Sequence, residues 1–278
     1  MYGWAGKVLR VNLSTREIDK EPLNQEWAQD FIGGRGLNIR TLYDEVTSET
    51  DPMSPENPLI IGVGPCNGTL VAGSSRLTVT TKSPLTGFLG DASTGATFGA
   101  ELKYAGYDQI IIRGKSDKPV YLWIEDDKVE IRDAAHLWGK NVVPTISSLE
   151  QECKAPGIGL LCIGPAGENL VRFATIMGPM GRAAGRTGVG TVMGSKKLKA
   201  MVVKGSQGVK VAHPERLEET FREMRRVWLE DRKEDYERKV KYGLNELLWA
   251  YRRLDIASVR NYQGGEFEGW DNYDPKLL

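Results

Sequence analysis

Hydrophobic and polar residues alternate in short stretches of the first two hundred positions, the pattern of half-buried β-strands. Residues 7–13 place Leu9, Val11 and Leu13 on one face. Similar runs, rich in β-branched and aromatic residues and bounded by Gly, Pro, Asn or Asp, predict further strands. These are expected at 59–63, 77–81, 109–113, 120–125, 128–132, 159–163, 171–176 and 200–204. Asp126 and Asp127 separate two of them, which predicts a hairpin over 120–132.

Helical spacing of apolar residues is limited to shorter segments of the same region. It predicts helices at 26–31, 37–46, 99–105 and 143–153. Because strands dominate, the fold class predicted for residues 1–208 is α+β, with short helices beside the sheet.

The pattern changes after the glycines at 205 and 208. Beyond Pro214 the chain is strongly charged, and its apolar residues recur at helical spacing: Leu217, Phe221, Met224 and Trp228. A second helix is expected over 244–254. Two helices of this size bury little apolar surface without more of their domain or a partner chain. We therefore interpret 209–278 as the incomplete beginning of a helical second domain.

Composition and charge exclude several classes of protein. The 40% hydrophobic and 27% charged content is ordinary for a globular protein. Thirty-seven basic residues balance thirty-seven acidic ones, so no overall field favours nucleic acid or an anionic membrane. Neither a signal peptide nor an apolar run of roughly 18 residues is found. Cys66, Cys153 and Cys162 form no Cys-x-x-Cys pair or disulfide framework, so a reducing, cytoplasmic location is expected.

Glycine is the outlier, with 32 residues where average usage predicts about 20. Glycine lets a backbone approach a ligand closely, so the excess indicates tight turns around something bulky. Three segments rich in Gly, Ser and Thr also carry an Arg or an Asp: 64–76, 83–95 and 181–190.

The last of these segments holds Arg182 and Arg186 among small residues. Exposed backbone N–H groups and two guanidinium forks suit phosphate, and an arginine fork also stacks along a flat heterocycle. A glycine-rich structural turn with two solvated arginines is the alternative. The spacing fits neither a Walker A loop nor a dinucleotide fingerprint, which disfavours a nucleotide-binding fold.

Other candidate chemistry is weaker. His136 and His213, the only histidines, are interpreted as structural or surface residues. The sequence contains no H-E-x-x-H motif, Cys/His metal cluster or G-x-S-x-G elbow. The carboxylates at 125–127 are explained by the hairpin turn.

Taken in order, motifs along the whole chain resemble those of the aldehyde:ferredoxin oxidoreductase family of tungstopterin enzymes. They are GKVLRVNLSTREI, GGRGL (33–37), DPMSPENPLIIGVGP, TKSPLTGF, FGAELKYAGYDQIIIRGKSDKPVYLWI, VEIRDAAHLWGK, IGPAGENLVRFATI and GRAAGRTGVGTVMGSKKLKA. The resemblance implies that residues 1–208 form a β-rich base domain of paired sheets. On that base lie two pterin dithiolenes that hold one tungsten or molybdenum atom.

The resemblance also implies a role for particular residues. Arg76 would bridge a pterin and a nearby [4Fe-4S] cluster. The pterins and their phosphates would be contacted by Ser93, Gly95, Arg182, Ala183, Gly185 and Arg186. A magnesium ion that joins the two phosphates would be bound by the backbone carbonyls of Ser93 and Ala183. The family often has Asn where this chain has Ser93, a change that a main-chain ligand survives. Four dithiolene sulfurs satisfy the metal, so no Cys or His ligand is required here.

The implied activity is oxidation of aldehydes to carboxylates, with two electrons passed through a [4Fe-4S] cluster to ferredoxin. The family's cluster cysteines and the residues beside the metal lie beyond the equivalent of Leu278. Catalytic residues are therefore not identified, and this chain alone is expected to be inactive. The implied partners are ferredoxin or an electron-transfer subunit, the rest of the enzyme, and further copies in a homo-oligomer.

Two alternatives stay open. The chain is also compatible with the active-site subunit of a benzoyl-coenzyme A reductase-like paralogue, whose substrate residues would lie downstream as well. The second alternative is a non-catalytic scaffold or partner domain. Arg76, Arg182 and Arg186 argue against it, because an arginine-rich glycine cradle without a ligand has no electrostatic purpose. The substrate, the choice of tungsten or molybdenum, the oligomeric state and whether the chain is a fragment or a short subunit are not specified.

Overall fold

A computed structural model describes residues 1–154, 157–273 and 277. They divide into two compact units, Met1–Pro214 (unit 1) and Glu215–Leu278 (unit 2). The division follows Pro214, slightly after the boundary predicted at 208. The charged helical sequence begins at this division.

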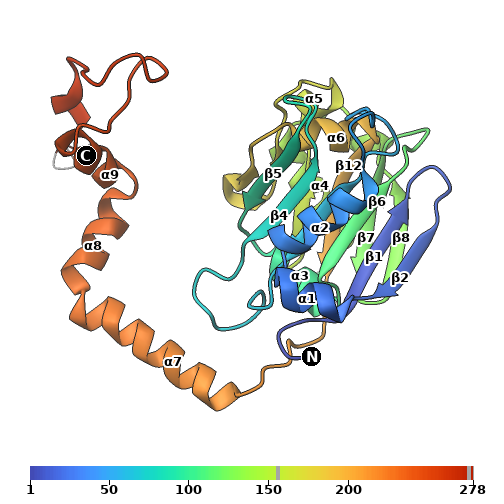
Figure 1. The fold of residues 1–278 in the computed structure, drawn as a ribbon, viewed down its shortest axis with the longest axis horizontal. Coiled ribbons are helices and arrows are strands. Elements are labelled where there is room, and N and C mark those ends of the chain that lie inside the picture. The colour runs from blue at the N-terminus through green and yellow to red at the C-terminus, as the bar shows by residue number, and fades with distance from the viewer. Residues whose placement is uncertain (155–156, 274–276, 278) are drawn as a thin grey trace. The chain divides into compact units, whose positions relative to one another are not determined.

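Unit 1 is built on two mixed sheets of six strands each in the part of the chain that the structure describes (Figure 1). The first sheet has the order β2-β1-β6-β3-β4-β5. Its strands are β1 (Lys7–Asn12), β2 (Ile18–Pro22), β3 (Leu59–Val63), β4 (Leu77–Lys82), β5 (Leu89–Thr94) and β6 (Gln109–Arg113). The second sheet has the order β11-β10-β9-β12-β7-β8. Its strands are β7 (Val120–Glu125), β8 (Lys128–Asp133), β9 (Gly159–Cys162), β10 (Ile176–Met177), β11 (Ala183–Ala184) and β12 (Leu198–Lys204).

The two sheets have the same topology. In the first, β1 pairs with β6 in parallel, and its other neighbouring strands are antiparallel. In the second, β7 and β12 form the corresponding parallel pair. Strands β7 to β12 occupy the same places in the second sheet as strands β1 to β6 occupy in the first. We refer to the two halves of unit 1 that contain β1–β6 and β7–β12 as its two repeats. β5 and β11 are therefore equivalent edge strands.

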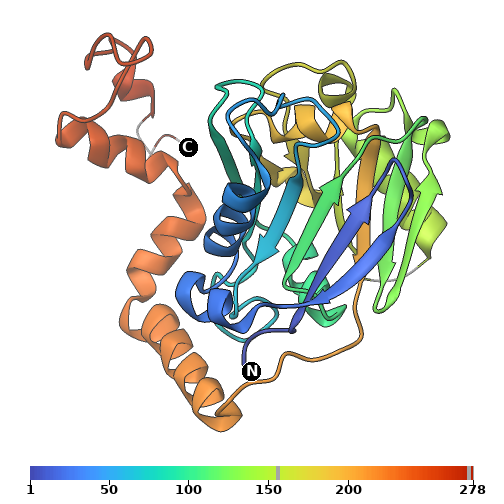
Figure 2. The same cartoon turned by 45° about the vertical axis from the view of Figure 1, so that its right-hand side comes forward.

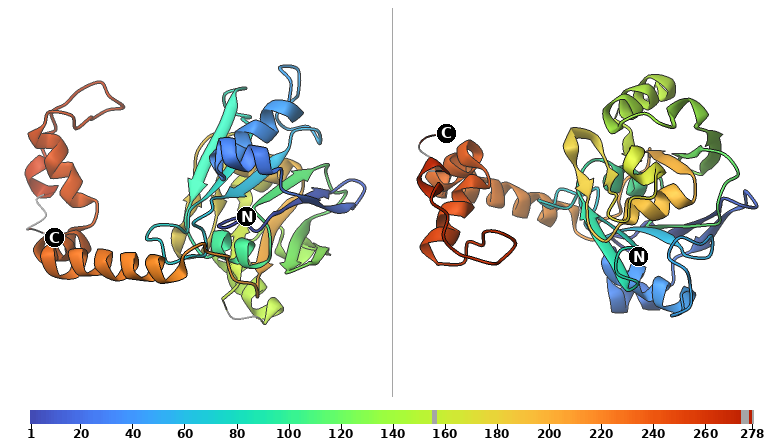
Figure 3. Two further views of the ribbon diagram at one scale, coloured as in Figure 1. Left: turned by 60° about the horizontal axis from the view of Figure 1, so that its bottom comes forward. Right: turned by 90° about the horizontal axis from the view of Figure 1, so that it is seen from above.

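Helices fill the space between the sheets and cover their outer faces. The inward side chains of both sheets form one apolar core with α3 (Phe98–Tyr104) and α6 (Val189–Ser195). A second cluster packs α1 (Gln25–Phe31) and α2 (Arg35–Glu45) on the outer face of the first sheet, visible in Figure 2. A third packs α4 (Val142–Cys153) on the outer face of the second sheet, opposite α1 and α2 in Figure 3. The short helices are η1 (Ala135–Leu137), α5 (Pro165–Glu168) and η2 (Pro179–Gly181).

Each central helix contacts the sheet of the other repeat. α3 follows β5 in the chain but packs on β9 and β12, and α6 packs on β3, β4 and β5. These approaches are close. A Cβ atom at Gly159 of β9 would lie 2.5 Å from the Cα atom of Phe98, and one at Gly194 of α6 would collide with the carbonyl group of Gly167. Glycine is therefore required at Gly159, where α3 packs on β9 of the other half, and at Gly194, where α6 packs on α5 of its own half.

The predicted α+β class and the two-sheet base are confirmed, and so are most predicted elements. The strand predicted at 171–176 is wrong for most of its length, because β10 begins only at Ile176. Leu170 adopts a positive φ of 57°, and Phe173 is exposed, so this stretch is a turn. The sequence patterns did not predict β2, β5, β11, α5 or α6.

Unit 2 consists of short helices. They are α7 (Pro214–Arg226), the π-helical turn η3 (Val227–Asp231), α8 (Lys233–Tyr242), α9 (Asn245–Arg253) and η4 (Trp270–Tyr273). Helix α8 was not predicted. Among the described residues of this unit, only Ala257 and Trp270 are buried hydrophobic side chains. In the described parts of both units, no helix combines the length and the apolar sequence needed to cross a membrane.

Candidate functional site

A cavity of about 760 Å³ lies beside β5 and β11, where the equivalent edges of the two sheets contact each other. Its lining comes from the start of α2, the residue directly before β4, one face of β5, and β11 with the loop that follows it. The lining residues are Arg35, Ile39, Arg76, Leu89, Asp91, Ser93, Ala183, Gly185 and Arg186.

The alternation of β5 explains which of its residues line the cavity. Successive side chains of a strand point to opposite faces. Gly90, Ala92 and Thr94 are buried on the inner face, whereas Leu89, Asp91 and Ser93 share the other face and reach the cavity. The segment 83–95 thus combines a buried inner face with a face that lines the cavity.

The structure brings together most residues that the sequence singled out. Arg76, Ser93, Ala183, Gly185 and Arg186 line this one cavity, although they come from distant parts of the chain. The remaining two predicted residues, Gly95 and Arg182, are not in the lining but are adjacent in sequence to strands that line it. Gly95 directly follows β5, and Arg182 directly precedes β11.

The cavity carries an excess of positive charge. Its lining holds three arginines, Arg35, Arg76 and Arg186, and one carboxylate, Asp91, a formal charge of 3 − 1 = +2. Within the described residues, Arg76, Arg182 and Arg186 form no ion pair with a carboxylate. Arginines that are exposed and unpaired at a concave surface suit a polyanionic ligand.

Small residues leave room for that ligand. A Cβ atom at Gly185 would meet nothing closer than the Cγ2 atom of Thr175 at 3.7 Å, and one at Gly95 nothing closer than Ser75 Oγ at 3.9 Å. Packing against the protein therefore does not require glycine at either position. At Gly185, which lines the cavity, a larger side chain would occupy the space of the cavity itself.

Helix α2 is anchored to the first sheet by buried amides and hydroxyls. Gln109 Nε2 of β6 donates to Asn38 Oδ1 at 2.9 Å and to Thr41 Oγ1 at 3.2 Å. Asn38 Nδ2 in turn donates to the carbonyl of Thr78 at 3.0 Å. Because these side chains are buried, the network fixes the helix that carries Arg35 and Ile39 to the cavity.

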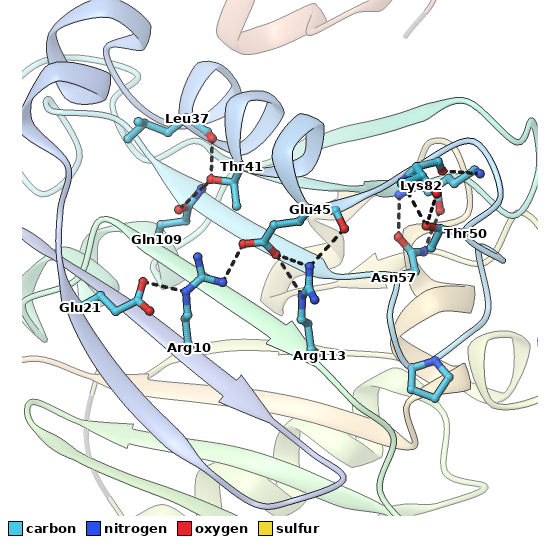
Figure 4. Close-up of polar contacts among 12 residues, drawn as sticks. Arg10, Glu21, Leu37, Thr41, Glu45, Thr50, Asn57, Lys82, Gln109 and Arg113 are labelled. Carbon is cyan, nitrogen blue, oxygen red and sulfur yellow. Dashed lines mark hydrogen bonds and ion pairs between the residues drawn. The ribbon is translucent and has the colours of Figure 1, made fainter.

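An ionic cluster holds the other end of α2. Figure 4 shows the Glu45 carboxylate between two guanidinium groups, Arg10 of β1 and Arg113 of β6. The Glu45 oxygens lie 2.7 Å from Arg10 Nη1 and 2.8 Å from Arg113 Nη2. The carboxylate side chain is only 14% exposed. Together with the amide network, it leaves α2 little freedom to shift relative to the sheet.

Cys153, Cys162 and the two histidines do not form a further reactive centre. Burial raises the pKa of the Cys162 thiol to about 12 and that of Cys153 to about 11, so both thiols are protonated at neutral pH. His136 pairs with Glu152 at 3.1 Å on the surface, and His213 is exposed. Within the described ranges, no three His, Cys, Asp or Glu residues are grouped so that they could bind a metal ion.

Sequence reasoning missed Arg35, Ile39, Leu89 and Asp91 as cavity residues. Arg35 stands inside the GGRGL motif and Asp91 inside the segment 83–95, so both were in regions already marked. No spacing rule predicts that residues 35 and 91 lie close together. Their proximity depends on the order of the strands in the first sheet, which places β5 near the start of α2.

Comparison with known proteins decides the family. The model of the aldehyde ferredoxin oxidoreductase N-terminal domain matches residues 8–205, most of unit 1. The chain belongs to the aldehyde ferredoxin oxidoreductase family.

Relatives within and around this family match well beyond that domain. The tungsten-containing aldehyde ferredoxin oxidoreductase of Thermococcus kodakarensis is 47% identical over 268 residues, which cover 96% of this chain and 44% of that protein. The Pyrococcus furiosus enzyme of the same name is 51% identical over 223 residues, 80% of this chain and 37% of that protein. This member of the aldehyde ferredoxin oxidoreductase family thus spans less than half the length of these relatives.

A solved structure has a similar fold. It is the active site complex BamBC of benzoyl coenzyme A reductase in complex with 1,5-dienoyl-CoA, with a TM-score of 0.79 and 41% identity. The similarity covers 82% of this chain and 35% of that one.

Proposed function

We propose that unit 1 is the base on which a bis-pterin cofactor with tungsten or molybdenum lies. The enzyme to which it belongs would oxidise aldehydes to carboxylates and pass the electrons through a [4Fe-4S] cluster to ferredoxin. The observation that carries this proposal is the cavity at the contact of β5 and β11, which combines a net positive lining with small residues. Equivalent strands of two equivalent sheets suit a ligand that itself has two equivalent halves.

The residues present fit such a group. Arg76, Arg182 and Arg186 would neutralise the phosphates and lie along the pterin edges, because a guanidinium both forks onto phosphate and stacks on flat rings. Gly95 and Gly185 would let the rings approach the backbone. The backbone carbonyls of Ser93 and Ala183 would hold a magnesium ion between the phosphates, since carbonyl oxygens are ligands that suit this hard cation.

When bound, the cofactor supplies a metal centre that accepts two electrons from the aldehyde. This chain's own part is to bind and orient that group. The cluster ligands and the residues that touch the substrate are expected in the larger part of the relatives' length that this chain does not span. We therefore expect the 278-residue chain to be inactive by itself. Its proposed partners are the remaining domains or a companion chain, ferredoxin, and further copies in a cytoplasmic homo-oligomer.

A second candidate function rests on the similarity to the BamBC complex. In that case the same base would serve the reduction of an aromatic thioester. The two candidates share the cofactor cavity and differ in substrate residues outside this chain, so they are distinguished by assay and not by unit 1.

The test is metal and pterin analysis of the protein purified from its native source with its natural partners. We expect about one tungsten or molybdenum and about four iron atoms per active unit, and oxidation of aldehydes with a viologen acceptor. Activity on an aromatic thioester but not on aldehydes would favour the second candidate. Protein without pterin, tungsten or molybdenum would overturn both and favour the scaffold alternative.

A further inference from the structure

We propose that Arg35 is a further anion-binding residue of the cavity, which contacts a phosphate group of the ligand, and that Asp91 positions its guanidinium. This inference rests on the proposed function and extends it to two residues that the family resemblance does not assign. It starts from one juxtaposition: Arg35 Nη2 lies 2.7 Å from Asp91 Oδ2, and both residues line the cavity.

The backbone of Arg35 is held firmly while its side chain reaches solvent. Arg35 is the first residue of α2, the helix fixed by the Asn38–Gln109 amides and by Glu45. Its side chain is 62% exposed. A guanidinium has five N–H donors in a planar fork. One of its nitrogens faces Asp91, so further donors remain for a second acceptor on the cavity side.

Asp91 depends on Arg35 for its charge balance. It is the only carboxylate in the lining, its side chain is 19% exposed, and Arg35 is its only ion-pair partner among the described residues. Its other oxygen, Oδ1, is buried and has no hydrogen-bond donor in the described structure. A carboxylate in that position would repel a phosphate unless a cation stood beside it. The guanidinium of Arg35 therefore neutralises Asp91, which without this partner would repel an anionic ligand.

The same helix offers a matched comparison. Arg40 pairs with Asp44 at 2.9 Å, one helical turn apart, and stacks on Trp27 at 4.9 Å, away from the cavity lining. Replacement of Arg40 removes the same charge from the same helix. A loss of anion binding that replacement of Arg35 causes and replacement of Arg40 does not must therefore come from the position of Arg35.

The experiment measures binding of inorganic pyrophosphate to the 278-residue chain by calorimetry at constant ionic strength. We expect R35Q to weaken binding about tenfold, the effect of one charge-assisted hydrogen bond, and R40Q to change it less than about twofold. D91N removes a negative charge and yet is expected to weaken binding, because it frees the guanidinium that Asp91 orients. Thermal unfolding of each variant checks that the fold is kept.

The outcomes separate this inference from the proposed function. If R76Q and R186Q weaken binding but R35Q does not, the inference is wrong and the phosphate cavity stands. If D91N tightens binding, Asp91 acts only by repulsion and does not position Arg35. If the wild-type chain binds no pyrophosphate, or if all the arginine variants bind like the wild type, both the inference and the proposed cofactor cavity are overturned.

Discussion

Ser83 Oγ donates a 2.8 Å hydrogen bond to the backbone carbonyl of Thr187, 104 residues away. Ser83 is fully buried at the start of the loop between β4 and β5, and Thr187 directly follows the cavity residue Arg186. Thr187 has a φ of 59°, which is unusual for a β-branched residue. The bond therefore links the two repeats and fixes the loop that carries Arg186.

Replacement of Ser83 by alanine should loosen this loop. The hydroxyl also accepts hydrogen bonds from the N–H groups of Leu85 and Thr86, both at 3.1 Å. We expect S83A to lower the free energy of unfolding by about 1–3 kcal/mol, because three hydrogen bonds of a buried hydroxyl are lost, and to weaken pyrophosphate binding. Urea titration and calorimetry measure the two effects. The exposed Ser48 provides the control, and equal stability of S83A and S48A would contradict the role of the bond.

Gly185 should be replaceable without loss of stability but not without loss of binding. Since a Cβ atom there meets only ordinary contacts, we expect G185L to change the free energy of unfolding by less than about 0.5–1 kcal/mol. The leucine side chain would fill the cavity, so pyrophosphate binding should be abolished. Gly208, where a Cβ atom meets nothing within 4 Å, gives the matched control G208L. Unchanged binding by G185L would show that the ligand does not approach this backbone.

The buried Lys196 should make stability depend on pH. Its ammonium group donates to the carbonyls of Pro55 at 3.1 Å and Gly114 at 3.2 Å, and burial lowers the pKa of Lys196 from 10.5 to about 7. Between those values the unfolded chain binds a proton that the folded chain has lost. The Lys196 contribution therefore raises stability as pH rises from about 7 to 10.5, by at most roughly 1.4 kcal/mol per pH unit.

The measurement is urea unfolding of the wild type and K196M across this pH range. The wild type should gain stability relative to K196M as pH rises above neutral. K118M, at a side chain that is 73% exposed, serves as the control and should follow the wild type. A difference between wild type and K196M that stays constant with pH would refute the assignment.

Glu45 should matter more to stability than its neighbour Glu21. E45Q leaves Arg113 without its carboxylate and weakens the pairing of Arg10 in a partly buried cluster. We expect a loss of about 1–3 kcal/mol. E21Q removes a partner of Arg10 that is 47% exposed, and it should cost less than about 1 kcal/mol. Denaturant titration compares the two, and similar values would mean that the cluster does not anchor α2.

Hydrophobic periodicity predicted the strands that have one apolar and one polar face. It failed for elements whose faces do not differ in this way. In β5, Asp91 and Ser93 alternate with buried residues, but Gly90 on the inner face and these polar side chains on the cavity face hid the strand. Every residue of α6 is buried, so the helix has no polar face to reveal its period. Its Gly194 is required by close contact with α5, and its Gly190 by close contact with the backbone of Thr175.

The candidate site was predictable only in part, for a related physical reason. Runs of Gly and Arg are visible in the sequence as local excesses, and the family motifs added residues such as Arg76 and Ser93. The Arg35–Asp91 pair depends on strand order, because β5 lies at the sheet edge next to the start of α2 only once β3 and β4 are in place. No local pattern contains that information.

The interlocked helices also bear on how the chain is made. Since α3 packs on strands β9 and β12 and α6 packs on β3, β4 and β5, neither half can complete its core alone. The shared core includes Leu198, Met201 and Val203 of β12, so it can be complete only after this last strand has left the ribosome during synthesis. A ligand that lies between β5 and β11 therefore needs both sheets to be folded before its cavity exists.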